Sequence, residues 1–410
     1  MLPAIKLARR HKRLDITSEN AMLVAIVASV YADVPLLQET IAIEGFNESK
    51  IADLFAWGAA ANCMQSVEFF LSWGYSPPAA ALIHAAANGH FETVKRLLEN
   101  AEAWFYASTL SVALIAACEK GSVNVDVVRC LLSVSLTNPG HNKNAALIAS
   151  VEGGHTELVS LLLETKKCDP SDQDNKCVLL ATSKGYEDII DLLLNTESCK
   201  LNISVNDNAP IRVAVSGGYT RMVASLLATR NCDPSAIDNQ CIITACTNGF
   251  THIVELLLRH PSVDPRASQC DSLVRAAKGG YFEIVEMLLE WHGPEGEYMD
   301  PSAQNNATIV EASKNGHASV VRVLLDCEGV SARVNNNEAF YRACCGGHLE
   351  VAELLYFSRD LKLDPAVGLR ACEEAAKGAH TSTVSFLLRV VGVPVSSSVL
   401  LLVVRPCRRK

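Results

Sequence analysis

The sequence has little of what catalytic and metal-binding proteins usually display. Its 15 cysteines are spread along the chain without the close Cys-x-x-Cys pairs that metal sites use. No Gly-x-Ser-x-Gly nucleophile elbow occurs, and no glycine-rich loop is followed by Gly-Lys-Ser or Gly-Lys-Thr. These absences argue against an enzyme and predict a chain that uses no catalytic residue, no metal and no cofactor. The scattered cysteines are typical of small buried apolar residues in a reducing compartment.

Basic residues are also scarce. Lys and Arg number 36 against 45 Asp and Glu, so the formal net charge is −9. Because phosphate binding needs a concentrated basic face, nucleic acid is excluded as the main ligand. The hydrophobic fraction of 49% with 20% charged residues predicts a folded chain. At 410 residues it is too long for one ordinary core, which leaves several domains or an extended array.

Long uninterrupted apolar runs are missing at both ends. The stretch from Phe386 to Val404 is broken by Arg389, Pro394 and three serines, and Val399 to Val404 alone is too short to span a bilayer. A membrane anchor is therefore disfavoured. The first fourteen residues are basic and fit a mitochondrial presequence, a nuclear signal or a solvated helix, of which we favour the helix. We expect a cytoplasmic protein, with the nucleus as the alternative.

What the sequence does have is an internal repeat of about 32 residues. Each copy is marked by a glycine, or a residue in its place, which we call the anchor. The anchors are Asn62, Gly89, Gly121, Gly154, Gly185, Gly218, Gly249, Gly280, Gly316, Gly347 and Ala379. Four residues before each anchor stands a small residue, such as Ala245 or Ala343, which lets helices approach closely. Five residues after it comes Val or Ile in nearly every copy, and a Leu-Leu pair usually follows three residues later, which gives one apolar helical stripe.

Each copy is therefore predicted to be a helix, a glycine turn, a longer helix and a polar loop. Asp-Pro pairs, as at Asp233-Pro234, mark the exit from the second helix, because proline cannot continue it. Ten residues before the anchor, six copies carry asparagine, which can accept a hydrogen bond from an unpaired backbone amide at a helix start. These are Asn144, Asn175, Asn208, Asn239, Asn306 and Asn337. A pair of short helices cannot bury its own stripe, so the copies must stack.

The segments at residues 88–98 (Asn-Gly-His-Phe-Glu-Thr-Val-Lys-Arg-Leu-Leu) and 346–355 (Gly-Gly-His-Leu-Glu-Val-Ala-Glu-Leu-Leu) resemble the ankyrin repeat signature. The resemblance covers roughly residues 55–390. The family's Thr-Pro-Leu-His is absent, and Asn239-Gln240-Cys241-Ile242 stands in its place. This departure resembles a divergent ankyrin subset with an Asp-Pro-Ser…Asp-Asn loop, as seen from Asp233 to Asn239.

The resemblance implies an all-α, ankyrin-type helical repeat solenoid of about eleven units with an N-terminal helical cap. It also implies a non-catalytic scaffold that binds a protein or peptide partner on the concave face formed by loops and first helices. We expect residues 1–54 to be the cap or a short recruitment module, 55–390 the array, and 391–410 an apolar tail with a basic end. The alternative function is an adaptor that delivers a bound partner to a degradation or signalling enzyme through residues 1–54. A monomer is expected.

The candidate partner-binding residues come from one irregularity and from the predicted first helices. The interval between Gly280 and Gly316 is longer than the others and places Trp291 in an extended loop, where it could anchor a partner or pack under its own loop. The polar and aromatic candidates on first helices and turns are Lys184, Arg212, Gln240, Lys278, Lys314, Tyr341 and Arg342. Histidines recur just after the anchors, where other copies have tyrosine or phenylalanine, so this position is predicted to hold a packing ring with a polar tip rather than a metal ligand.

Overall fold

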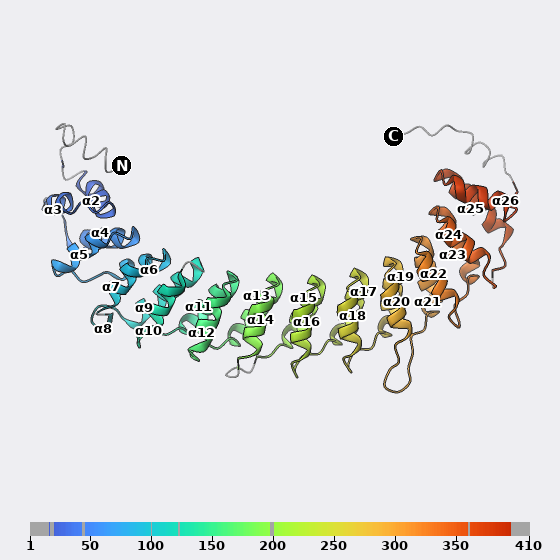
Figure 1. Ribbon diagram of the computed structural model, residues 1–410, viewed down its shortest axis with the longest axis horizontal. Coiled ribbons are helices and arrows are strands. Elements are labelled where there is room, and N and C mark those ends of the chain that lie inside the picture. Colours follow the sequence, from blue (N-terminus) through green and yellow to red (C-terminus); the bar gives the residue numbers. More distant parts are fainter. Residues whose placement is uncertain are drawn as a thin grey trace. The chain divides into compact units, whose positions relative to one another are not determined.

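The computed structural model describes residues 16, 20–42, 46–99, 101–121, 124–196, 201–359 and 361–394. The basic stretch at residues 1–14 and the apolar run from Val399 to Val404 lie outside these ranges. The chain divides into two compact blocks, an N-terminal block that ends at Asn202 and a C-terminal block that begins at Ile203. In Figure 1 each block is a row of helix pairs. A single antiparallel bridge, between His292 and Tyr298, is the one strand-like pairing in the described ranges.

The helices of the N-terminal block follow one another with short connections. They are α2 (Ala21–Val30), α3 (Val34–Ile41), α4 (Glu48–Ala60), α5 (Met64–Ser72), α6 (Ala79–Ala87), α7 (Phe91–Leu98), α8 (Ala101–Trp104), α9 (Ala107–Lys120), α10 (Val125–Ser133), α11 (His141–Glu152), α12 (Thr156–Glu164), α13 (Asp172–Lys184) and α14 (Glu187–Leu194). The short helix α8 is an insertion between two pairs.

The C-terminal block continues the same alternation. Its helices are α15 (Val205–Gly217), α16 (Thr220–Leu227), α17 (Ala236–Asn248), α18 (Thr251–Leu258), α19 (Ala267–Gly279), α20 (Phe282–Leu289), α21 (Ala303–Lys314), α22 (Ala318–Leu325), α23 (Val334–Cys345), α24 (Leu349–Tyr356), α25 (Pro365–Lys377) and α26 (Thr381–Arg389). The anchors lie in the turns of eleven pairs, α4/α5, α6/α7, α9/α10, α11/α12, α13/α14, α15/α16, α17/α18, α19/α20, α21/α22, α23/α24 and α25/α26. The predicted repeats are therefore confirmed, although the first helix is the longer one in most pairs.

One further pair, α2/α3, extends the same pattern toward the N-terminus. Its turn residue Ala32 has φ 61°, and the Asp33 amide donates to the Ala28 carbonyl over 3.0 Å, as in the repeats. The Ser29 hydroxyl donates to the Leu54 carbonyl of α4 over 2.8 Å, so this pair packs on the first repeat. The sequence pattern does not show this pair because Leu37 replaces the usual Val or Ile and Thr40-Ile41 replaces the Leu-Leu pair. The expected boundary between residues 54 and 55 falls inside α4.

The turn between the helices of a repeat explains two of the sequence constraints. At the turn after α23, Gly347 has φ 73°, and the His348 amide donates to the Ala343 carbonyl over 2.9 Å. This is a Schellman-type end, which satisfies a free carbonyl and requires a left-handed residue after the helix. Ala343 is fully buried, because the neighbouring first helix passes close to it. The anchor and the small residue four positions earlier thus belong to one motif.

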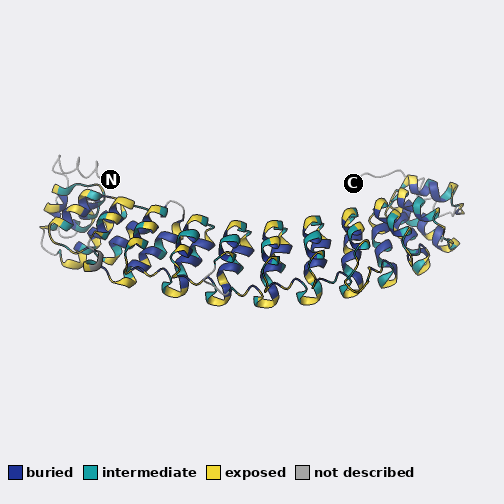
Figure 2. Cartoon of the chain, turned by 60° about the horizontal axis from the view of Figure 1, so that its bottom comes forward, coloured by how far each residue is buried: buried dark blue, intermediate teal, exposed yellow. Residues whose placement is uncertain are grey.

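The predicted apolar stripe lies in the core of each repeat. In α18, Val254 and Leu257 are fully buried, whereas Leu258 is half-buried. Figure 2 shows buried residues where helices pack together and exposed residues concentrated toward the helix ends and loops. Within each block, successive first helices contact one another more extensively than successive second helices do. The two sides of the stack therefore differ, with tight packing on the first-helix side and wider spacing on the second-helix side.

Candidate partner-binding surface

The ring that follows each anchor ties one repeat to the repeat before it. Nε2 of His348 lies 3.1 Å from the Lys314 carbonyl oxygen, and Nε2 of His317 lies 3.0 Å from that of Lys278. A Cβ built on Gly316 would lie only 2.4 Å from Nδ1 of His348, so no larger residue fits beneath the ring. Tyr281 lies against Gly249 in the same manner. These positions hold packing rings with polar tips, as the sequence predicted.

The six asparagines form a second connection between repeats. The Asn239 side-chain oxygen accepts from the Asp264 amide over 2.8 Å, and that of Asn306 accepts from the Ser331 amide over 2.9 Å. The other four make the same bond, Asn144 with Asp169, Asn175 with Asn202, Asn208 with Asp233, and Asn337 with Asp364. The amide that donates belongs to the loop that leads to the next repeat and not to the asparagine's own helix, which corrects the capping role expected from the sequence.

A left-handed turn precedes the regular part of the first helix in seven repeats. In each, three successive residues have φ between 50° and 65°. They are residues 142–144, 173–175, 206–208, 237–239, 268–270, 304–306 and 335–337. Asn and Asp dominate these triplets, because their short polar side chains tolerate the left-handed region better than other residues with a Cβ. The turn directs the third side chain, usually asparagine, toward the next repeat.

The five polar candidates from the sequence lie on or at the end of first helices. Lys184 belongs to the N-terminal block and is exposed at the end of α13. In the C-terminal block, Lys278, Lys314 and Gln240 are exposed, and Lys314 lies 3.8 Å from Glu311 in an ion pair. Arg212 is different, because its guanidinium donates to the backbone carbonyls of residues 206 and 207 over 3.0 Å. Arg212 thus supports its own left-handed turn.

The structure brings Tyr341 and Arg342 together with a third residue that sequence reasoning missed. Arg370 of α25 lies over the Tyr341 ring, with its guanidinium carbon 5.0 Å from the ring centre, and Arg342 lies 6.0 Å from it. A hydrogen bond with the Cys345 thiol, and then burial, raise the pKa of Tyr341. Glu338 pairs with Arg342 over 2.6 Å. We call Tyr341, Arg342 and Arg370 the tyrosine–arginine cluster, which lies on first helices of two neighbouring repeats.

The extended loop after α20 carries two aromatic residues, Trp291 and Tyr298, and the structure agrees with the alternative that Trp291 packs under its own loop. Trp291 is half-buried, and the Arg266 guanidinium lies 5.7 Å from its ring centre. Arg266 is itself held by Asp264 over 2.9 Å. Tyr298, which pairs with His292 across the base of the loop, is 70% exposed. The loop therefore presents Tyr298 and packs Trp291 against its own base. The sequence signal that could have pointed to Tyr298 is its position directly after a Gly- and Glu-rich turn.

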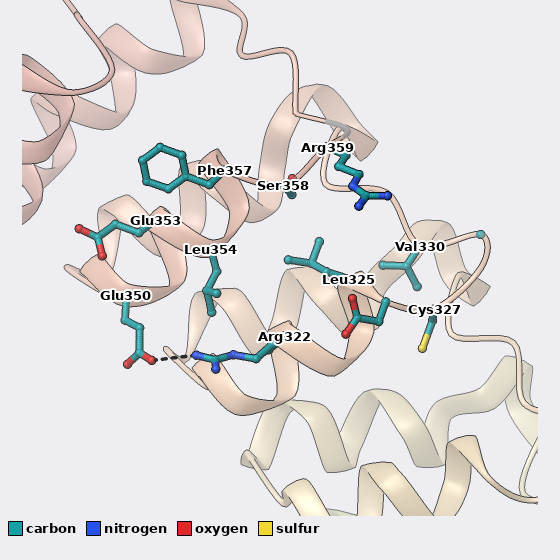
Figure 3. A pocket seen from close by; sticks show the side chains of 12 residues that line it. Arg322, Leu325, Cys327, Val330, Glu350, Glu353, Leu354, Phe357, Ser358 and Arg359 are labelled. Atoms are coloured by element: carbon teal, nitrogen blue, oxygen red, sulfur yellow. Dashed lines mark ion pairs between the residues drawn. The ribbon is translucent and has the colours of Figure 1, made fainter.

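Two cavities lie on the second-helix side, one in each block. The larger, of about 920 Å³, lies between α22 and α24 and is lined by Leu325, Leu354, Phe357 and charged residues (Figure 3). Arg322 and Glu350 pair over 3.6 Å at one edge of it. The smaller, of about 530 Å³, lies between α12 and α14 and includes Leu163. Leu163 and Leu325 are both nine residues after their anchors, so the two cavities occupy equivalent positions in their repeats.

The cysteines and other potential ligands are not arranged for chemistry. None of the cysteines in the described ranges forms a disulfide, and burial raises the pKa of the Cys118 thiol to about 11. Nowhere in those ranges do three or more His, Cys, Asp or Glu side chains gather in a way that could hold a metal ion. Among the described helices, none combines the length and the apolar character needed to cross a bilayer.

Comparison with known sequences agrees with this architecture. A search of curated proteins finds no match. A sequence model of the family described as "Ankyrin repeats (3 copies)" matches three stretches, residues 82–174, 114–207 and 211–300. Together these stretches include more than half of the 410 residues and lie within the helix pairs described above. The chain therefore belongs to the ankyrin repeat family.

Proposed function

We propose that the chain is a non-catalytic scaffold that binds a protein or peptide partner on the first-helix side of its C-terminal block. Ankyrin repeats are in general protein–protein interaction modules. Successive first helices contact one another more extensively than successive second helices do, and we place the partner on that side. The observation that supports this location best is the tyrosine–arginine cluster, since tyrosine and arginine dominate the binding energy of interfaces.

The surroundings of the cluster suit a partner with acidic or aromatic groups. Lys278 and Lys314 are exposed at the ends of first helices earlier in the same block. Their neighbours Arg275 and Arg342 are paired with acids of their own helices, over 3.1 and 2.6 Å. Such exposed pairs contribute little to stability, so a partner can replace them at small cost. Tyr298 adds an exposed aromatic ring at the loop after α20.

A double variant tests this location. Tyr341→Ala/Arg370→Ala in the full chain is compared with Tyr106→Ala, which removes an 83% exposed tyrosine from the N-terminal block. Partners are first identified by affinity purification with mass spectrometry, and the dissociation constant of a purified partner is then measured. Loss of a hot-spot pair predicts at least a ~10-fold weaker affinity for the double variant and no change for Tyr106→Ala. Equal affinity for all three proteins would rule out this surface.

The adaptor function stays a second proposal. It places a recruitment role in residues 1–54, and the described part of this segment includes α2 and α3, which pack on α4 through Ser29. That packing supports a cap. Deleting residues 1–19, which leaves α2 and α3 in place, separates the two roles. Loss of a bound degradation or signalling enzyme, with the scaffold partner retained, would support the adaptor, and an unchanged set of bound proteins would count against it.

A further inference from the structure

The cavity between α22 and α24 lies next to a groove that an aromatic ring occupies. Nine residues after the anchor, α22 ends with Leu325 and α24 ends with Tyr356. The Tyr356 ring packs edge-on against Phe386 of α26, with 5.6 Å between ring centres, and so occupies the groove between α24 and α26. The preceding groove, which Leu325 lines, is open, with a volume of about 920 Å³.

The groove combines a few apolar side chains with a charged lining, and exposed apolar residues continue beyond it. Leu325 and Leu354 point into the opening in Figure 3, and Phe357 stands at its rim. The Phe357 ring is 69% exposed, which is unusual for a phenylalanine. It contacts the Tyr356 ring at 5.2 Å between centres, and the Tyr356 hydroxyl donates to the Val390 carbonyl over 3.5 Å. Val390 is also half exposed, so the strip leads to the end of α26.

The chain leaves the last repeat beside this groove. A Cβ built on Gly368 would lie 3.2 Å from Val393 and 3.4 Å from Leu363, so both residues lie next to Gly368. Leu363 belongs to the loop whose first residues, Ser358 and Arg359, form one wall of the groove. An extended chain covers roughly 3.3–3.6 Å per residue. Five residues beyond Pro394 therefore span about 17 Å, which exceeds the 8–10 Å between packed helices.

The sequence that follows Pro394 matches the groove in polarity and in charge. Residues 399–404 read Val-Leu-Leu-Leu-Val-Val, and the basic residues Arg405, Arg408, Arg409 and Lys410 come after them. No acidic residue follows Glu374 in the sequence. The groove carries three acids, Asp326, Glu350 and Glu353, against two arginines. An apolar segment followed by positive charge can thus contact Leu325, Leu354 and the exposed Phe357 ring, with a net negative lining beside them.

We propose that residues 399–404 of the same chain bind in the groove between α22 and α24, with the basic residues after them facing Glu350 and Glu353. Docking covers Phe357 and the apolar run at once, and burial of apolar area is the main source of its free energy. Because the segment is tethered a few residues away, its effective concentration at the groove is high. The groove is on the second-helix side, so it is separate from the tyrosine–arginine cluster.

Two native cysteines allow a direct test in the full chain. Cys327 lines the groove and Cys407 follows the apolar run. Cys130 and Cys345 are likewise only half-buried but lie outside the groove, in the N-terminal block and on the first-helix side, and they serve as internal controls. The protein is treated at low concentration with a short bismaleimide, and the linked peptides are quantified by mass spectrometry. A Leu400→Asp/Leu401→Asp/Leu402→Asp variant is treated in parallel.

Docking predicts that Cys407 links to Cys327 several-fold more than to Cys345 or Cys130, within one chain, and that the triple variant loses this preference. Hydrogen exchange at residues 356–359 is expected to be slower in the wild type than in the variant. Equal linkage to the three cysteines, or a preference that survives the leucine substitutions, would overturn the proposal. Linkage mainly between two chains would also overturn it, since a second copy would then be the occupant.

Discussion

The first-helix side and the second-helix side of the same repeats differ in how closely the helices pack and in how the repeats are connected. On the first-helix side, fully buried small residues such as Ala312 and Ala343 let helices pack closely, and rings and asparagines connect each repeat to its neighbour. On the second-helix side, successive helices contact one another less, and cavities lined by residues such as Leu325 and Leu354 lie between them. The difference suggests that the array holds its spacing on one side and leaves room for an apolar ligand on the other.

The largest effect on the free energy of unfolding is expected from substitutions in the core, which lies between the two sides. Leu257 of α18 is fully buried in the apolar stripe. Leu257→Ala is expected to lower the free energy of unfolding by about 2–5 kcal/mol through lost burial and a residual cavity. Chemical denaturation measures this change. The half-buried Leu258→Ala is the matched control and should cost clearly less. A near-neutral Leu257→Ala would mean that the stripe does not form the core.

The next largest effect is expected from the asparagine bond, which the first-helix side has. Asn306→Ala removes the acceptor of the Ser331 amide and leaves an alanine at φ 57°, so we expect a loss of about 2–3 kcal/mol in the free energy of unfolding. Asn306→Gly tolerates the left-handed backbone and should lose only the hydrogen-bond part, about 1 kcal/mol. Equal, negligible effects of both substitutions in denaturation experiments would show that the repeats are not held by this bond.

The smallest effect concerns the loop aspartates. Hydrogen bonding from Arg266 lowers the pKa of Asp264 below its ordinary value of 3.8. A lowered pKa contributes stability that is complete above the ordinary value and is lost as the pH falls through the lowered one. Asp264→Asn should therefore destabilise the protein by less than about 1 kcal/mol near neutral pH, because the group is largely exposed. The difference from wild type should close on acidification, and a constant difference would exclude the ion pair as its cause.

How far the sequence could predict the structure depends on where each interaction partner lies. The anchor, the small residue before it and the stripe after it are local signals, and helices form at each of them. The Asn306 bond could not be assigned, since its partner Ser331 is 25 residues away in the next repeat. The left-handed triplets contradict the usual rule that such residues occur singly, so only their asparagine content indicated them.

The residues of the candidate surface could likewise be predicted only where the signal is local in the sequence. Tyr341 and Arg342 could be chosen because they stand on a predicted first helix, but Arg370 lies in the next repeat and joins them only through stacking of the helices. Trp291 was expected in the right loop, yet Arg266, from the start of the repeat, holds its ring at the base. The cavity could not be foreseen because its walls come from two adjacent repeats, with Leu325 in one and Leu354 in the next.

Native-state hydrogen exchange, followed by mass spectrometry, compares the two sides most directly. The account predicts that first helices of the C-terminal block, such as α19 and α21, exchange more slowly than the second helices α20 and α22, because closer packing and inter-repeat bonds must break before they open. Asn306→Ala should remove much of this difference in α21. Equal protection of first and second helices in the wild-type protein would contradict the account.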